Sequence, residues 1–164
     1  DRFSADLLHE NISLSQEVKF TEKDLEIFKA LNVDPREAQK LHRIFLLKAF
    51  PPSRKSFKTF VLNNQIGTIV THHGGDNVFA FQMPDGTLEP LCPQGSILVF
   101  DADEKIEAGN VAGMIVAGRV LVRKVYIQNK HIILQSTSGE EPPQLVGKES
   151  LINCFRAVEC IKKL

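Results

Sequence analysis

The sequence predicts an α+β protein in which an N-terminal helical segment precedes a mainly antiparallel β domain. Near the N-terminus, apolar residues recur at helical spacing. From about residue 57, the apolar runs become short and rich in β-branched and aromatic residues, and turn-forming Gly, Asn and Asp pairs separate them. With 164 residues, 43% of them apolar, the chain can bury its own core. We therefore expect two parts, residues 1–52 and residues 57–164.

The first expected helix follows Thr21. This residue can cap the helix, and Asp24 three positions later resembles the second half of a capping box. Behind the cap, a helical apolar stripe contains Leu25, Ile27, Phe28 and Leu31. The run Asn32 to Pro35 then ends the helix.

A second helix is expected to begin at Pro35, whose fixed φ suits the first helical position, with Asp34 as its cap. Its apolar positions at helical spacing are Ala38, Leu41, Ile44, Phe45 and Leu47. Pro51 and Pro52 end it, because proline lacks an amide hydrogen and restricts the residue before it.

The expected strands cover residues 60–62, 69–71, 78–81, 96–100, 114–117, 120–126, 131–135 and 154–161. Turn signals such as Gly74–Gly75, Asp85–Gly86 and Gly109–Asn110 lie between them. Short strands separated by turns are typical of a compact antiparallel domain.

Charge and hydropathy exclude several classes of protein. Twenty basic and twenty acidic residues cancel, so no global positive field attracts nucleic acid. No apolar run approaches the roughly 18 residues that span a membrane. The first residues also lack the basic and apolar regions of a secretory signal. We expect a cytoplasmic protein without a membrane partner, in which Cys92, Cys154 and Cys160 stay reduced.

No motif indicates a cofactor or a metal. The phosphate-binding, dinucleotide-binding, zinc-protease and serine-hydrolase motifs are all missing from the sequence. The adjacent His72 and His73 would point to opposite faces of a strand, so we do not expect them to share an ion. Cys154 and Cys160, six residues apart, would share one face of a regular strand as small buried side chains. Cys92 is expected in a loop.

From Val78 onward, strands and turns follow one another in a distinctive order. The turns and strands in question are Gly86–Pro90, Pro93–Ser96, Ile97–Phe100, Gly109–Asn110 and Val122–Lys124. This order resembles the C-terminal domain of the LexA, UmuD and lambda-type phage repressors, over about residues 60–164. The resemblance implies the LexA-type β fold.

The same resemblance implies a self-cleaving peptidase site, which this sequence does not match. In the family, a serine attacks a peptide bond of its own chain and a neutral lysine removes the serine's proton. Thr87 stands at the serine position and Arg123 at the lysine position. A guanidinium stays protonated and has no lone pair to accept a proton. We therefore expect the fold without catalytic residues.

Two further features bear on cleavage. Lys124 is the alternative base, but it would need a β-bulge to reach Thr87, because neighbouring residues of a strand face opposite sides. The family's scissile Ala-Gly or Cys-Gly pair is missing before Thr87. The Ala-Gly pairs present, Ala108–Gly109, Ala112–Gly113 and Ala117–Gly118, all follow it. An active threonine-type peptidase that uses Thr87 and Lys124 remains the alternative hypothesis.

The run from Ser13 to Pro35 resembles the end of a lambda-repressor-type helix-turn-helix domain, without a recognisable recognition helix. The alternative is an amphipathic helical hairpin that packs on the β domain or on a partner chain.

Together these resemblances imply the dimerisation and regulatory domain of a DNA-binding transcriptional repressor of prophage or mobile-element type. It would reach operator DNA through a helix-turn-helix that lies mostly outside these residues. The homodimer is expected to form near residues 151–161, through Cys154, Phe155, Val158 and Ile161. An antirepressor protein would release it from DNA. Glu89, Arg123 and Lys124 are candidates to bind that partner, or else are solvated side chains, and Arg123 could pair with Glu89. A protein-binding module without a DNA role is a third possibility.

Overall fold

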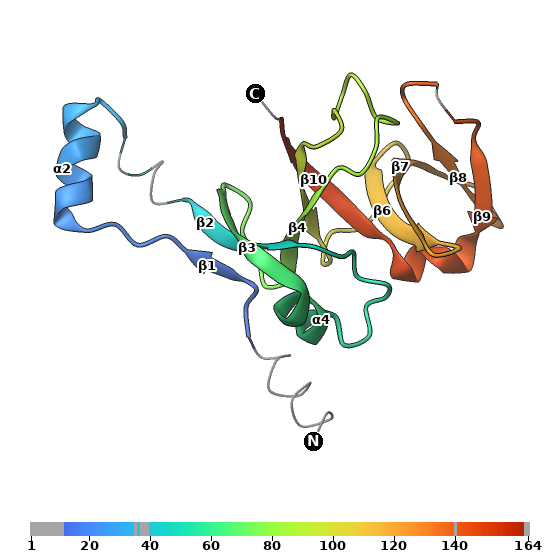
Figure 1. Ribbon diagram of the computed structural model, residues 1–164, viewed down its shortest axis with the longest axis horizontal. Helices are drawn as coiled ribbons and strands as arrows, with labels where there is room; N and C mark the ends of the chain where they lie inside the picture. Colours follow the sequence, from blue (N-terminus) through green and yellow to red (C-terminus); the bar gives the residue numbers. More distant parts are fainter. Residues whose placement is uncertain (1–11, 35, 37–39, 140, 163–164) are drawn as a thin grey trace.

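The computed structural model describes residues 12–34, 36, 40–139 and 141–162. Its strands form one sheet in the order β1-β2-β4-β5-β10-β6-β7-β8-β9, with β3 paired to β2 (Figure 1). The strands are β1 (Ser15–Glu17), β2 (His42–Leu47), β3 (Gln65–Thr71), β4 (Val78–Gln82), β5 (Ile97–Asp101), β6 (Val111–Val116), β7 (Arg119–Ile127), β8 (His131–Gln135), β9 (Gln144–Gly147) and β10 (Phe155–Ile161). The described helices are α2 (Glu22–Ala30), α4 (Phe57–Asn64) and the 3₁₀ helix η1 (Lys148–Asn153).

The strands pair almost entirely in antiparallel fashion, which confirms the predicted α+β class. The exception is a short parallel contact in which Leu46 and Leu47 of β2 pair with Ala80 and Phe81 of β4. The strands predicted at residues 69–71, 78–81, 96–100, 114–117, 120–126, 131–135 and 154–161 are confirmed, with small shifts at their ends. No helix among the described residues has both the length and the apolar character needed to cross a membrane.

Helix α2 begins where the sequence predicts, and both halves of its capping box form. The Thr21 hydroxyl accepts a hydrogen bond from the Asp24 amide at 3.2 Å, and the Asp24 carboxylate accepts one from the Thr21 amide at 2.9 Å. The ring of Phe20 packs edge-on against Phe28, with centroids 5.0 Å apart. No residue of α2 is buried, and the helix stands away from the sheet at one end of the molecule (Figure 1).

The second predicted helix is wrong over residues 42–47, which form β2. Of its predicted apolar stripe, Ala38 lies outside the described residues, whereas Ile44 and Leu47 are buried as parts of a strand. Strand β2 pairs with β3 along its whole length and with β1 at its start. The run Ile44–Leu47 is apolar at every position, so its period does not separate a strand from a helix, and the pairing with β3 decides.

The strand predicted at residues 60–62 is also wrong, because these residues belong to helix α4. Phe57 and Val61, one helical turn apart, are its buried residues. Phe57 stacks on Phe155 and lies edge-on to Phe79, with centroid distances of 5.4 and 5.5 Å. Packing of this one face onto the sheet makes the segment helical despite its β-prone residues.

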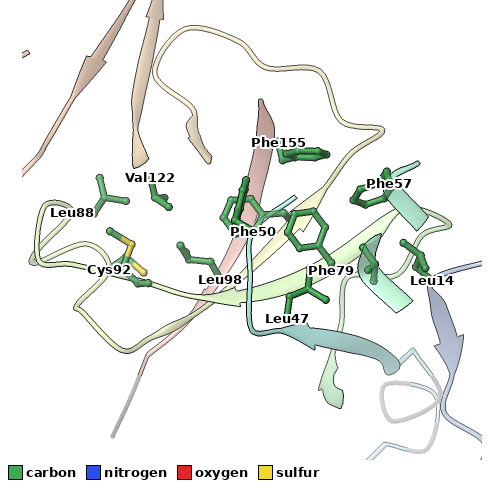
Figure 2. Close-up of a cluster of buried hydrophobic side chains, with 13 residues drawn as sticks. Leu14, Leu47, Phe50, Phe57, Phe79, Leu88, Cys92, Leu98, Val122 and Phe155 are labelled. Carbon is green, nitrogen blue, oxygen red and sulfur yellow. The ribbon is translucent and has the colours of Figure 1, made fainter. Parts of the chain in front are cut away.

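The main core is a group of phenylalanine rings centred on Phe50 (Figure 2). The Phe50 ring lies edge-on to Phe79, Phe100 and Phe155, with centroids 5.2 to 5.7 Å apart. It comes from the chain that follows β2, which therefore closes the core of the β domain. Gly113 on β6 leaves room for this ring, since a Cβ at that position would lie 2.6 Å from Phe50 Cζ.

Candidate functional site

Thr87 lies in the loop that follows β4 and is almost fully buried, with 2% of its surface exposed. The Asp85 carboxylate orients it. One oxygen, Oδ1, accepts hydrogen bonds from both the Thr87 amide at 3.1 Å and the Thr87 hydroxyl at 2.6 Å. This local turn, in which an aspartate bonds the chain two residues on, is common for Asp. The hydroxyl hydrogen therefore points to Asp85.

Arg123 of β7 supplies the second half of the site. Its side chain is 3% exposed. Its Nη1 donates to Thr87 Oγ1 at 2.7 Å and to the Val122 carbonyl at 2.9 Å, and its Nη2 donates to Glu141 Oε2 at 2.8 Å. The two positions singled out from the sequence therefore meet, as a hydroxyl that accepts a hydrogen bond from a guanidinium.

Charged side chains around this contact form a closed network. Arg119 lies four residues before Arg123, on the same face of β7, and its Nη2 donates to Glu141 Oε1 at 2.6 Å. Asp85 Oδ2 lies 3.7 Å from Arg119 Nη2 and 3.6 Å from Arg123 Nη2. Two carboxylates thus balance two guanidiniums. Hydrogen bonds from Arg119 and then Arg123 hold the pKa of the Glu141 carboxyl below its usual range.

The loop after β8 covers Thr87 from the other side. The amides of Thr137 and Ser138 donate to the Thr87 carbonyl at 2.8 and 3.1 Å, and the Thr137 hydroxyl donates to the Glu89 carbonyl at 3.1 Å. The same loop carries Glu141. Both the main chain and the hydroxyl of Thr87 are therefore held by contacts within the chain.

The expected ion pair between Arg123 and Glu89 is wrong. Arg123 pairs with Glu141 and Asp85 instead, whereas the Glu89 carboxylate is exposed and accepts from the Gln94 amide at 3.4 Å. Burial also removes Arg123 from the surface that a partner protein would contact first. Glu141 could not be recognised from the sequence, because it lies in a loop 18 residues beyond Arg123.

Lys124 does not share the Arg123 site. In an unbroken register it faces Val111 of β6 and Gln135 of β8, with no bulge on β7 around it. Neighbouring residues of a regular strand point to opposite faces, so Lys124 points away from the face that carries Arg123 and Thr87.

The predicted interface residues fall into two groups. Cys154 and Phe155 are completely buried inside this chain, and a folded monomer does not present them to a partner. Val158 and Ile161 are partly exposed and lie in the second half of β10. Strand β6 pairs only with Phe155 and Arg156 of β10, while β5 pairs with β10 as far as Ile161.

The expectation that Cys154 and Cys160 share one face of a regular strand is wrong. Strand β10 begins at Phe155, after Cys154, and its register shifts between Ala157 and Glu159. The Cys154 sulfur lies 3.6 Å from that of Met114, whereas Cys160 and Cys92 line a small cavity of about 180 Å³. Burial, and then the neighbouring Cys160, raises the pKa of the Cys92 thiol to about 12. Burial raises the pKa of Cys154 to about 11. Cys92 and Cys154 are thus protonated and unreactive near neutral pH.

The fold and this site define a mainly antiparallel β domain in which a buried hydroxyl, Thr87 in the loop after β4, accepts a hydrogen bond from a buried guanidinium, Arg123 on β7. A family model described as Peptidase S24-like matches residues 56–155, which is more than half of the chain. The chain belongs to the Peptidase S24-like family. No curated protein matches it.

Proposed function

We propose that this chain is the dimerisation and regulatory domain of a cytoplasmic, DNA-binding transcriptional repressor of prophage or mobile-element type, and that it does not cleave itself. Membership of the family supports the kind of domain. The main observation in favour of lost cleavage is the hydrogen bond that Arg123 donates to Thr87.

Self-cleavage requires a base that removes the hydroxyl proton and an oxygen lone pair that is free to attack. Arg123 supplies no base, because a guanidinium has five donors and no acceptor. It also donates to Thr87 Oγ1, which engages a lone pair of the attacking atom. Lysine works in such dyads only when neutral. At this position the chain has instead a guanidinium, which pairs with the carboxylates of Asp85 and Glu141.

One of the Ala-Gly pairs, Ala112–Gly113, is a poor substrate for such an attack. Ala112 and Gly113 lie within β6, where they pair with Arg123 and Val122 of β7 on one side and with β10 on the other. A peptide bond held on both sides by strands is not free to enter a cleft. This argues against cleavage at Ala112–Gly113 independently of Thr87 and Arg123.

Alkaline incubation tests the proposal. High pH deprotonates lysine and promotes cleavage in the family, so the full-length protein should keep its intact mass over hours at pH 10, measured by mass spectrometry. Thr87→Ala is the matched control, because it removes only the hydroxyl and methyl groups. Fragments from the wild type that Thr87→Ala does not produce would overturn the proposal. They would favour the alternative peptidase that uses Thr87 and Lys124.

For the dimer, we propose pairing through the second half of β10. In the described part of the chain, residues 158–161 have no neighbouring strand on the side opposite β5. An open strand edge pairs readily with a second strand, and two identical edges can do so about a twofold axis. Val158 and Ile161 would then meet their counterparts. Such a dimer would hold two DNA-binding heads at the separation of two half-sites.

Without cleavage, release from DNA requires another trigger, and we propose an antirepressor protein that binds the β domain. Glu89 is an exposed candidate contact on the Thr87 loop. The competing hypothesis is a protein-binding module with no DNA role. A mobility-shift assay of the full-length protein on its own promoter region distinguishes the two, because only the repressor retards the DNA.

A further inference from the structure

A second cluster of side chains lies outside the Thr87 site. His73, Asp101 and Glu104 each bring one potential ligand atom to within 4.8 Å of the others. His73 lies in the loop that follows β3, Asp101 is the last residue of β5, and Glu104 follows three positions later. We propose that these three side chains bind a divalent transition-metal cation of the zinc type.

Asp101 is the fixed ligand of the proposed site. Its side chain is 8% exposed, and its Oδ1 accepts a hydrogen bond from the Asp103 amide at 2.9 Å. The other oxygen, Oδ2, lies 2.8 Å from His73 Nε2. A buried carboxylate is costly unless its charge is compensated. A cation next to Oδ2 compensates it directly.

The donor set suits zinc. Zn²⁺ binds imidazole nitrogen and carboxylate oxygen at roughly 2.0–2.2 Å, with ligand atoms roughly 3.3 Å apart in a tetrahedron. The distance between His73 Nε2 and Asp101 Oδ2, now 2.8 Å, needs to increase only slightly to reach that spacing. Glu104 is 45% exposed and can swing in. His73 would present its Nε2 lone pair, with its proton on Nδ1, and water would take the fourth position.

Charge around the cluster also favours a cation. Besides Asp101 and Glu104, the Asp103 carboxylate lies nearby and accepts from Asn77 Nδ2 at 2.9 and 3.0 Å. The opposing charges are Arg156, whose Nη1 lies 3.6 Å from Glu104 Oε2, and Arg54, whose guanidinium donates to the Ala102 carbonyl. Three carboxylates against two guanidiniums leave an excess of one negative charge, and the metal would have to displace Arg156 from Glu104.

The loop that carries His73 is held in place by the N-terminal part of the chain. The Ser15 hydroxyl donates to the Gly75 carbonyl at 2.7 Å and accepts from the Gly75 amide at 3.0 Å. The Leu14 amide donates to the Asp76 carbonyl at 2.9 Å. Gly74 packs so closely against the His42 ring that a Cβ there would lie 2.5 Å from it. A ligand held by such a frame is preorganised.

Zinc titration of the tag-free, reduced protein tests the site, with isothermal calorimetry as the readout. The wild type should bind one Zn²⁺ per chain. Loss of a positioning contact around a metal typically weakens binding 10–100-fold, so loss of a ligand in His73→Ala or Glu104→Ala should weaken it at least about tenfold. His72→Ala is the matched control, because it removes the neighbouring imidazole that is not part of the cluster, and it should bind like the wild type.

X-ray absorption of the zinc-loaded protein adds a readout that does not depend on variants. It should show nitrogen and oxygen ligands only, with no sulfur at about 2.3 Å. Equal zinc affinity in the wild type and Glu104→Ala would overturn the proposal, as would sulfur in the first coordination sphere. Glu104 is exposed, so this variant should fold, which thermal unfolding checks.

Discussion

The guanidinium of Arg123 donates a hydrogen bond to the hydroxyl of Thr87 across 2.7 Å, and both side chains are almost wholly buried. Residues 36 positions apart thus meet in a buried contact, at the two positions that the resemblance to LexA-type repressors assigns to the serine and the lysine. The charge of Arg123 is balanced by Glu141 and Asp85. The site has the character of a structural ion-pair network, and the following predictions address its energetics and the surfaces around it.

Glu141→Gln should lower the free energy of unfolding by about 1–2 kcal/mol. Removing one partner of a buried pair costs about 3–5 kcal/mol. The cost is reduced here because Glu141 is partly exposed and Asp85 remains near Arg123. Urea denaturation measures the difference. Glu26→Gln, with the same change on an exposed face of α2, is the matched control and should be neutral. Equal stabilities of the two variants would contradict a structural role for the network.

The contribution of Glu141 should depend on pH. Its pKa is lowered in the folded state relative to the ordinary value of 4.5, so its stabilising effect is fully present above that value. The effect is lost as the pH falls through the folded-state pKa. The stability difference between wild type and Glu141→Gln should therefore be constant from pH 7 to about pH 5 and shrink below pH 4.5. Denaturation at pH 6, 4 and 3 checks this. A stability difference that grows as the pH falls would contradict the predicted direction of the pH dependence.

Gly113→Ala should destabilise the domain by about 1–3 kcal/mol, the usual cost of forcing an extra methyl into a packed core. The new Cβ would lie 2.6 Å from Phe50 Cζ and 2.9 Å from Phe100 Cε1. Thermal unfolding gives the measurement. Gly139→Ala has open space around the new methyl and tests only the cost of a positive φ. A Gly113→Ala variant as stable as the wild type would contradict the close packing of the Phe50 and Phe100 rings against Gly113.

Val158→Asp should convert the proposed dimer into a monomer, because a charge at the meeting strands cannot be desolvated without a partner. Val158 also packs against the buried cluster of Ile44, Val78, Ala80 and Val99, so circular dichroism of the variant checks that it is folded. Light scattering after size-exclusion chromatography reads the mass. Val70→Asp, on the exposed face of β3, is the control and should stay dimeric. A Val158→Asp dimer would argue against pairing through the second half of β10. A monomeric wild type would remove the dimer altogether.

Local patterns predicted the parts of the fold that local interactions decide. The capping box at Thr21 and Asp24 marked the start of α2, and both of its hydrogen bonds form. Short runs of β-branched and aromatic residues, separated by turn signals, located β4 to β8. The pattern failed at Ile44–Leu47 and at Phe60–Leu62. There the apolar runs suit more than one structure, and distant partners decide, β3 in the first case and the Phe79 and Phe155 rings in the second.

By itself, the amino-acid sequence determined the chemistry of the two positions that the resemblance to LexA-type repressors picks out: a hydroxyl at Thr87 and a side chain without a lone pair at Arg123. Only the tertiary structure decided which carboxylates balance Arg123 and which side chains gather around His73. Ion pairing and metal binding depend on distances of a few ångströms between residues that lie tens of positions apart. Such distances follow from how the strands pair, and no local spacing encodes them.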